Sequence, residues 1–329
     1  MSRPRLIVQA LASSALAIAG TCSALAADSL SAYPARPVRV IVPFPAGGAP
    51  DIITRKVAQS LTPRLGQAIV VDNRPGAAGG LGVQIAAMAA NDGYTLIFLS
   101  ASHVAPELLG AATNVQRDFE PITQLNDTPS VLVVRGAGPY KGVEDLLKDL
   151  RARAGKLSYG SAGEGTAGHL AVGLLASLTG GFTATHVPYR GGVDTIPPLI
   201  NGQIDFVITV VPVTLPHIAS GRLRALAVTL RERFPGLPGV PTFEEAGIKG
   251  YRFTAWGGIA APKGVAPGIV DRLHREVAAI VADTQVKADF ISLGSIAVPS
   301  ASPVAFKATI EEEFVKIRKL VGEIGLKRE

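Results

Sequence analysis

Residues 38–65, VRVIVPFPAGGAPDIITRKVAQSLTPRL, contain the unit from which the fold is built. The apolar run at 38–42 predicts a strand that ends at Pro43. Apolar residues in 51–65 recur with helical spacing, and Pro50 suits the first position of a helix. A loop of Gly, Ala and Pro joins the two elements. The stretch therefore predicts a buried strand followed by a helix, which is the repeating unit of an α/β sheet.

Two series of such units occupy the chain. In the first, strands are expected at 38–42, 68–71 and 94–99, with helices at 51–65 and 81–90. In the second, strands are expected at 131–134, 157–160, 185–187, 204–207 and 226–230, with helices at 142–154, 167–178 and 193–201. A stretch at 253–259 leads to helices at 267–282 and 303–324. The pattern predicts two α/β domains, each with a mostly parallel sheet flanked by helices.

The first residues have the three parts of a secretory signal peptide. A basic start with Arg3 and Arg5 precedes an apolar segment at 6–20, and Ala24-Leu25-Ala26 fits a cleavage site. We expect cleavage near Ala26 and an exported protein in the periplasm. Cys22, the only cysteine, would leave with the signal peptide, so the mature chain would have no disulfide, Cys–metal site or thiol nucleophile.

The composition excludes some classes of protein. Of 329 residues, 47% are apolar and 18% charged, which is too apolar for a disordered chain. The formal net charge is +6, but the basic residues are scattered and aromatic residues make up 5%. A nucleic-acid platform would need a basic stripe with stacking aromatic residues, so no nucleic-acid partner is expected.

Gly, Ser and Thr are concentrated in the loops that follow the predicted strands. In open parallel sheets ligands bind outside the carboxyl ends of the strands, where glycine lets backbone N–H groups approach and helix starts favour anions. Such loops are also how α/β units turn, and His103, His169 and Asp205 could either contact a ligand or support a loop. The candidate ligand-binding residues are Phe44, Ala46, Gly47, Gly48, Asp51, Gly79, Ser100, Ser102, His103, Ser161, Gly165, Thr166, His169, Tyr189, Gly191 and Asp205.

Enzyme motifs are weak or absent. Residues 163–168 match G-x-G-x-x-G, but the next strand, at 185–187, ends without the acidic residue of a dinucleotide site. No G-x-S-x-G nucleophile motif and no H-E-x-x-H zinc motif occur. His186 reads as a structural residue, and Trp256 either packs between domains or contacts a ligand. These patterns predict no catalysis, no cofactor and no metal.

Several motifs in order along the chain resemble one family. They are YPARPV at 33–38, VPFPAGG at 42–48 with Asp51, VDNRPGA at 71–77, DGYTL at 92–96, YGSAG at 159–163 with Gly165, Thr166 and His169, VPYRG at 187–191, GRLRALAV at 221–228, and VPTF at 240–243 with Glu245 and Gly247. Behind a signal peptide, this series resembles the Bug-type substrate-binding proteins of tripartite tricarboxylate transporters.

The resemblance implies a periplasmic-binding-protein-like fold of type II with a ligand cleft between two domains. Domain 1 would comprise 27–130 and 255–329, and domain 2, at 131–254, would be inserted into it. The ligand would be a small carboxylate, either a di- or tricarboxylate or an aromatic acid, held by loop backbone and hydroxyl groups. The expected receptor is a monomer that docks on a permease of two integral subunits. A sensory co-receptor for a sensor kinase and, less favoured, an exported enzyme are the alternatives.

Two positions depart from the family pattern. Pro50 stands where the family often has Thr, which removes a hydroxyl group and a backbone N–H. Gly80 stands where the family often has Asn. Both changes lie in loops that the resemblance assigns to the ligand, so the resemblance does not identify the carboxylate.

Overall fold

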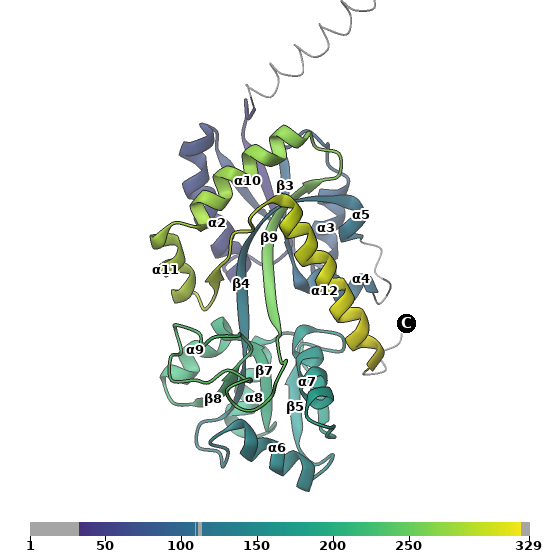
Figure 1. The fold of residues 1–329 in the computed structure, drawn as a ribbon, viewed down its shortest axis with the longest axis vertical. Helices are drawn as coiled ribbons and strands as arrows, with labels where there is room; N and C mark the ends of the chain where they lie inside the picture. Colours follow the sequence, from purple (N-terminus) through teal and green to yellow (C-terminus); the bar gives the residue numbers. More distant parts are fainter. Residues whose placement is uncertain (1–32, 109, 111–113, 324–329) are drawn as a thin grey trace, which may run out of the picture.

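The structure is a computed structural model that describes residues 33–108, 110 and 114–323. The expected signal peptide at 1–26, including Cys22, lies outside the described residues. The described chain forms two lobes along the long axis of the molecule, and the long strands β4 (Phe119–Arg135) and β9 (Thr254–Pro262) run between them (Figure 1).

Three parallel strands in the order β2-β1-β3 begin the first lobe. They are β1 (Val38–Val42), β2 (Ile69–Asn73) and β3 (Thr95–Ser100). β9 pairs antiparallel with β3. The first-lobe helices are α2 (Ala49–Leu65), α3 (Gly80–Ala87), α4 (Val104–Leu108), α5 (Val115–Asp118), α10 (Pro267–Val281) and α11 (Thr284–Ser292), with the 3₁₀ turns η1 (Ala77–Gly79) and η2 (Ala101–His103).

Local sequence explains both ends of α2. Pro50 stands in its first turn, where a missing N–H costs no helical hydrogen bond. The helix ends at Gly66, which has φ 71° and whose N–H bonds to the carbonyl of Thr62. Glycine adopts this left-handed conformation more readily than other residues do. One apolar face of α2, including Ile53 and Val57, is buried against the sheet.

The second lobe repeats the arrangement around β7-β5-β6. These parallel strands are β5 (Ser158–Ser161), β6 (Thr185–Pro188) and β7 (Phe206–Val210), and β8 (Leu223–Val228) pairs with β4. The helices are α6 (Val143–Ala152), α7 (Ala167–Leu178), α8 (Ile196–Asn201), preceded by η3 (Val193–Thr195), and α9 (Val211–Ala219).

A single strand, β4, belongs to both sheets. Its first half pairs antiparallel with β9 and its second half with β7 and β8, which gives the order β2-β1-β3-β9-β4-β7-β5-β6 in the described chain. The expected α/β fold with flanking helices is confirmed, but the sheets are mixed rather than mostly parallel. The reason is that β4 and β9 cross between the lobes and run against their neighbours.

The C-terminal helix α12 (Pro303–Glu323) lies along the side of the molecule and contacts both lobes. It packs against β4 and α4, and its far end contacts α7 (Figure 1). Phe306, Phe314 and Leu320 of α12 join Leu175 of α7 in one buried apolar cluster. Separate clusters fill the space between the first sheet and α2 and α10, and between the second sheet and α8.

None of the helices in the described residues is long and apolar enough to cross a membrane.

Candidate functional site

The carboxyl ends of the strands of both lobes meet near the middle of β4. Ser100, the last residue of β3, pairs with Gly257 of β9, and Gly257 pairs with Asn126 of β4. Val210, the last residue of β7, pairs with Ser130 of β4. Asn126 and Ser130 are four residues apart, or roughly 13 Å at about 3.3 Å per residue. The strand ends of the two lobes therefore point toward one another from opposite sides of this segment of β4.

On the first-lobe side, Asp51 fixes the loop between β1 and α2. Its Oδ2 accepts the N–H of Gly47 at 2.8 Å, and its Oδ1 accepts from Arg55 and from Asn73. Burial raises the pKa of Asp51, but these three donors outweigh burial and the pKa lies below its usual value. Both carboxylate oxygens are thus engaged within the protein. Asp51 shapes the loop, while Ala46 and Gly47 are exposed.

Behind this loop, His103 is buried beside Phe44 and Gly79. Its Nδ1 accepts the N–H of Ser100 at 3.1 Å, and its ring centre lies 5.5 Å from that of Phe44. Burial lowers the pKa of His103 to about 4. The hydroxyls of Ser100 and Ser102 bond to each other at 2.8 Å. Neutral His103 therefore supports the end of β3.

On the second-lobe side, hydrogen bonds inside the loop between β5 and α7 define its shape. The Oγ of Ser161 accepts the N–H of Gly163 at 3.0 Å, and the Oγ1 of Thr166 donates to the carbonyl of Gly163 at 2.6 Å. The N–H of Gly165 donates to Nδ1 of His169 at 3.0 Å. Thr166 precedes α7 without capping it through its side chain, so N–H groups of the first turn have no partner from this residue.

Four aromatic rings stack beneath this loop. Tyr159 stacks on Phe206, His186 and His169, and His186 also stacks on His169. The two imidazole centres are 4.4 Å apart with an angle of 2° between the rings. Burial lowers the pKa of both histidines; His186 lowers that of His169 further, while Glu164 opposes both shifts. The sequence pattern had indicated only a structural role for His186.

A small cavity of about 50 Å³ lies where α2 begins, beside the crossing strands. Pro50, Ser100, Asn126, Thr128 and Trp256 are among its lining residues. The amide nitrogen of Asn126 donates to the Thr128 hydroxyl at 2.9 Å, and Trp256 is 2% exposed. Asn126 and Thr128 are not among the candidate residues predicted from the sequence. The signal available was a row of polar residues inside an otherwise apolar strand.

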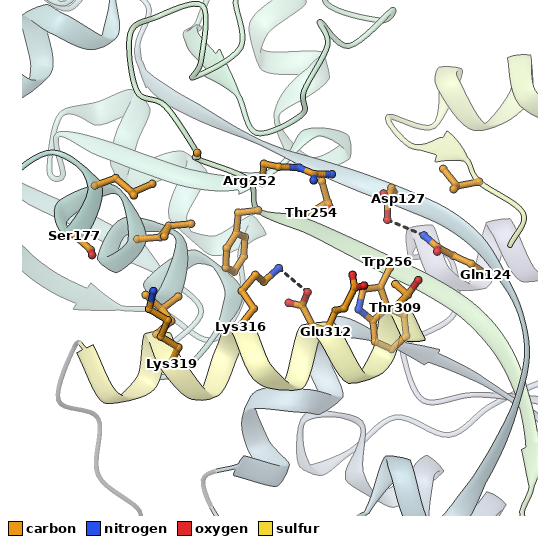
Figure 2. Close-up of a pocket in the computed structure, with 17 residues that line it drawn as sticks. Gln124, Asp127, Ser177, Arg252, Thr254, Trp256, Thr309, Glu312, Lys316 and Lys319 are labelled. Carbon is orange, nitrogen blue, oxygen red and sulfur yellow. Dashed lines mark hydrogen bonds and ion pairs between the residues drawn. The ribbon is translucent and has the colours of Figure 1, made fainter. Parts of the chain in front are cut away.

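A larger cavity of about 610 Å³ lies beside the crossing strands, between α7 and α12 (Figure 2). Asp127 and Trp256 approach it from the strands, Arg252 from the segment just before β9, and Lys316 of α12 binds Glu313 at 2.5 Å. Burial raises the pKa of Asp127 and of Glu313. None of the candidate residues selected from the sequence lines this cavity. It is a space at the side of the crossing strands and not the place where the strand-end loops meet.

Asp205 is the candidate that the structure places elsewhere. Its Oδ2 accepts the N–H and the hydroxyl of Ser158, the first residue of β5, at 2.7 and 3.2 Å. This pair lies at the amino ends of the strands, whereas the loop that begins at Ser161 follows the carboxyl end of the same strand. The prediction that Asp205 contacts the ligand is therefore wrong: Asp205 joins the start of β5 to the start of β7.

The loop after β6 is anchored to the carboxyl end of β5. The N–H of Tyr189 donates to the carbonyl of Ser161 at 2.8 Å, which places Tyr189 and Gly191 near the loop of the second lobe. The neighbouring Arg190 is exposed. No group of three or more His, Cys, Asp or Glu side chains within the described residues could hold a metal ion. The edge instead offers backbone N–H groups and hydroxyls, which suit hydrogen bonding to an anion.

Two α/β lobes joined by crossing strands, with Gly- and Ser-bearing loops at facing strand ends, define a periplasmic binding-protein fold. The chain is a member of the tripartite tricarboxylate transporter receptor family, TctC, whose pattern matches residues 53–326. This is a family of substrate-binding receptors, as the sequence motifs had predicted.

Three solved structures show the similarity. The chain is 33% identical to the periplasmic binding protein BugD, with a TM-score of 0.76 over 90% of this chain and 100% of BugD. It is 30% identical to Rhodopseudomonas palustris Rpa4515, determined with adipate, with a TM-score of 0.77 over 89% and 98% of the two chains. It is also 30% identical to R. palustris MatC, determined with malate, with a TM-score of 0.75 over 88% and 100%.

Proposed function

We propose that this protein is a periplasmic receptor that captures a small dicarboxylate between its lobes and delivers it to a permease. The observation that carries the proposal is the pairing along β4, where the ends of β3 and β7 are in register with Asn126 and Ser130, roughly 13 Å apart along the strand. Malate and adipate, present in two similar structures, are both small dicarboxylates. A carboxylate at each end would let one molecule contact both lobes.

The proposed ligand contacts are the loops at 43–48 and 161–166, with Ser100 and Tyr189 beside them. Both loops lead into helices, α2 and α7, that have no side-chain cap. Backbone N–H groups at such positions bind carboxylates without a buried cation. Pro50 removes one N–H at the start of α2, so the first lobe contributes fewer donors than the second. We infer that the second-lobe loop makes the stronger hydrogen bonds to the ligand.

The same proposal includes the organisation of the receptor. Domain 1 comprises 27–130 and 255–329, and domain 2 comprises 131–254; the packing of α10 on α2 and β4 supports returning the C-terminal part to domain 1. The receptor acts as a monomer after removal of the signal peptide at Ala26. Ligand binding closes the lobes, and the closed form is the one that engages a permease of two integral subunits.

Trp256 provides the experiment, because it is the only tryptophan and lies at the crossing strands. Malate and adipate are titrated into the mature protein while tryptophan emission is followed, with calorimetry as an independent measure. We expect saturable binding with micromolar affinity, and loss of the optical signal but not of the heat in Trp256→Phe. Absence of binding by both dicarboxylates at millimolar concentration, with a folded protein, contradicts the proposed ligand class.

A further inference from the structure

The stacked pair His169–His186 has a geometry that a simple packing role does not require. The rings are parallel within 2° and their centres are 4.4 Å apart, on two different elements, α7 and β6. Each ring is tied to the loop that the proposed function assigns to the ligand. Nδ1 of His169 accepts from Gly165, and Nε2 of His186 bonds to the Ser161 hydroxyl at 2.7 Å. Both imidazoles are therefore hydrogen-bonded to this loop, so a change in either protonation state would change the contacts of the loop.

His169 must be neutral for the loop to keep its observed shape. Its Nδ1 accepts the N–H of Gly165, so the ring proton is on Nε2. A second proton would have to bind Nδ1 and would face the Gly165 N–H, so that hydrogen bond would be lost. Gly165 has φ 69°, in the left-handed region, so the loop around it depends on local hydrogen bonds.

His186 is able to accept a proton without breaking a contact. The Ser161 hydroxyl has one hydrogen, which it can donate to the carbonyl of Gly163 at 2.9 Å, and it then accepts from Nε2 of His186. The basic atom of His186 is then Nδ1, for which no hydrogen bond is found among the described residues. Glu164 is the charged group beside the pair, and the Tyr159 ring packs against both imidazoles, its centre 4.9 Å from that of His186 and 6.3 Å from that of His169.

Two positive charges on parallel rings this close disfavour each other strongly, so protons bind to such a pair in separate steps. We propose, resting on the function proposed above, that His169 and His186 hold at most one proton near neutral pH and couple anion capture to uptake of that proton. His186 binds the proton, which comes from solvent, at Nδ1. His169 remains neutral and is a positioning residue that holds Gly165.

The direction of the coupling follows from the charges. An anion bound at the loop favours protonated His186, so it raises the pKa of that ring. Affinity for the anion then increases as the pH falls through the range in which His186 takes up its proton, by about tenfold for each pKa unit of ligand-induced shift. Protonation of His169 at still lower pH would release Gly165 and reverse the gain.

The proton distribution is tested first in the ligand-free protein by nitrogen-15 NMR of the imidazoles between pH 4.5 and 8.5. We expect His186 to titrate first and His169 to stay in its Nε2–H form until a distinctly lower pH. In His186→Gln, which keeps an amide donor for Ser161, His169 should titrate at a higher pH because the neighbouring charge is gone. Independent titration of the two rings with ordinary pKa values, unchanged in the variant, overturns the pairing.

The coupling is tested by calorimetry with malate and adipate in buffers of different ionisation enthalpy at pH 6.0 and 7.5. The wild type should take up a fraction of a proton on binding. Its gain in affinity from pH 7.5 to pH 6.0 should be about three- to tenfold larger than the gain measured for His186→Gln. The carboxyl groups of the probe titrate identically in both proteins, so the difference belongs to His186. Equal proton uptake in the two proteins overturns the coupling.

A second pair of variants tests His169. In His169→Asn an oxygen can replace Nδ1 as acceptor for Gly165, whereas His169→Phe has no acceptor. We expect His169→Phe to bind malate about five- to tenfold more weakly than His169→Asn, the effect of one lost hydrogen bond. Equal affinities overturn the positioning role. If neither probe binds the wild type, the ligand class and the coupling fail together, while the NMR titration still decides whether the rings share one proton.

Discussion

Gly79 lies so close to His103 that a Cβ atom at position 79 would stand 2.8 Å from Nε2 of the imidazole. The backbone of Gly79 also has φ 94°, a conformation that residues other than glycine rarely adopt. Two loops of the first lobe, one before α3 and one after β3, are thereby held in contact. The glycine is required for this approach as much as for the turn.

Substituting Gly79→Ala should therefore destabilise the protein by about 1–3 kcal/mol through backbone strain and displacement of the imidazole. The matched control is Gly239→Ala, where a Cβ would meet nothing within 4 Å and φ is not positive. This control should change stability by less than about 0.5 kcal/mol. Urea unfolding of both variants measures the difference, and equal stabilities would contradict the close approach.

The buried His103 should make the protein sensitive to acid. Its pKa of about 4 in the folded state lies below the usual value of about 6.5, so the unfolded chain binds more protons between these values. Neutral His103 contributes to the free energy of unfolding above about pH 6.5. This contribution is lost as the pH falls towards 4, and the total loss is about 3 kcal/mol.

In His103→Asn, an oxygen replaces Nδ1 as acceptor for the Ser100 N–H and nothing titrates. The free energy of unfolding should then fall between pH 7 and pH 4.5 by about 2–3 kcal/mol less than in the wild type. Carboxyl groups titrate in both proteins and cancel in the comparison. Parallel pH profiles would show that His103 is not held neutral.

Asp205 separates stability from ligand binding. Removing its carboxylate in Asp205→Ala leaves the N–H and hydroxyl of Ser158 without their acceptor, and we expect a loss of about 1–3 kcal/mol in unfolding free energy. Because this contact lies at the amino ends of the strands, affinity for malate or adipate should be unchanged in the folded variant. A large loss of affinity with unaltered stability would return Asp205 to the ligand site.

Thr166 and Arg190 distinguish a hydroxyl-and-backbone site from an arginine clamp. Thr166→Val removes the hydroxyl that bonds to Gly163 while keeping the shape of the side chain, and we expect binding to weaken by roughly tenfold to a hundredfold. Arg190→Gln, at an exposed position, should have the smaller effect. Calorimetric titration with malate and adipate gives both values, and the reverse order of effects would indicate the clamp.

Local pattern predicts those elements whose apolar residues have a clear period or are contiguous. The helix at 142–154 is found as α6, and the strands at 38–42 and 94–99 are found as β1 and β3, because each buries the face that its spacing indicates. α9 was missed because it contains Pro212 and Pro216, which the pattern treats as breaks. α11 was missed although its cap, Asp283, accepts two backbone N–H groups.

The middle of β4 shows what local pattern cannot supply. The sequence predicted only 131–134, because polar residues such as Thr123, Gln124 and Asn126 give the preceding stretch no apolar pattern. These residues are buried, and Asn126 bonds to the hydroxyl of Ser295, which is 169 positions away along the chain. The loops of the candidate site could be predicted from the sequence, because they follow apolar strands and contain glycine. The facing of the two lobes depends on this long strand.

The continuity of β4 determines how the lobes are mechanically related. No flexible linker takes up their rotation at this point; the backbone is paired with β9 on one side of Ser130 and with β7 on the other. Any rotation of one lobe against the other must be absorbed as twist spread along hydrogen-bonded backbone, which resists it with an elastic torque. If the lobes close on a molecule as proposed, the same paired strands would also drive the return to the open shape once the molecule has left.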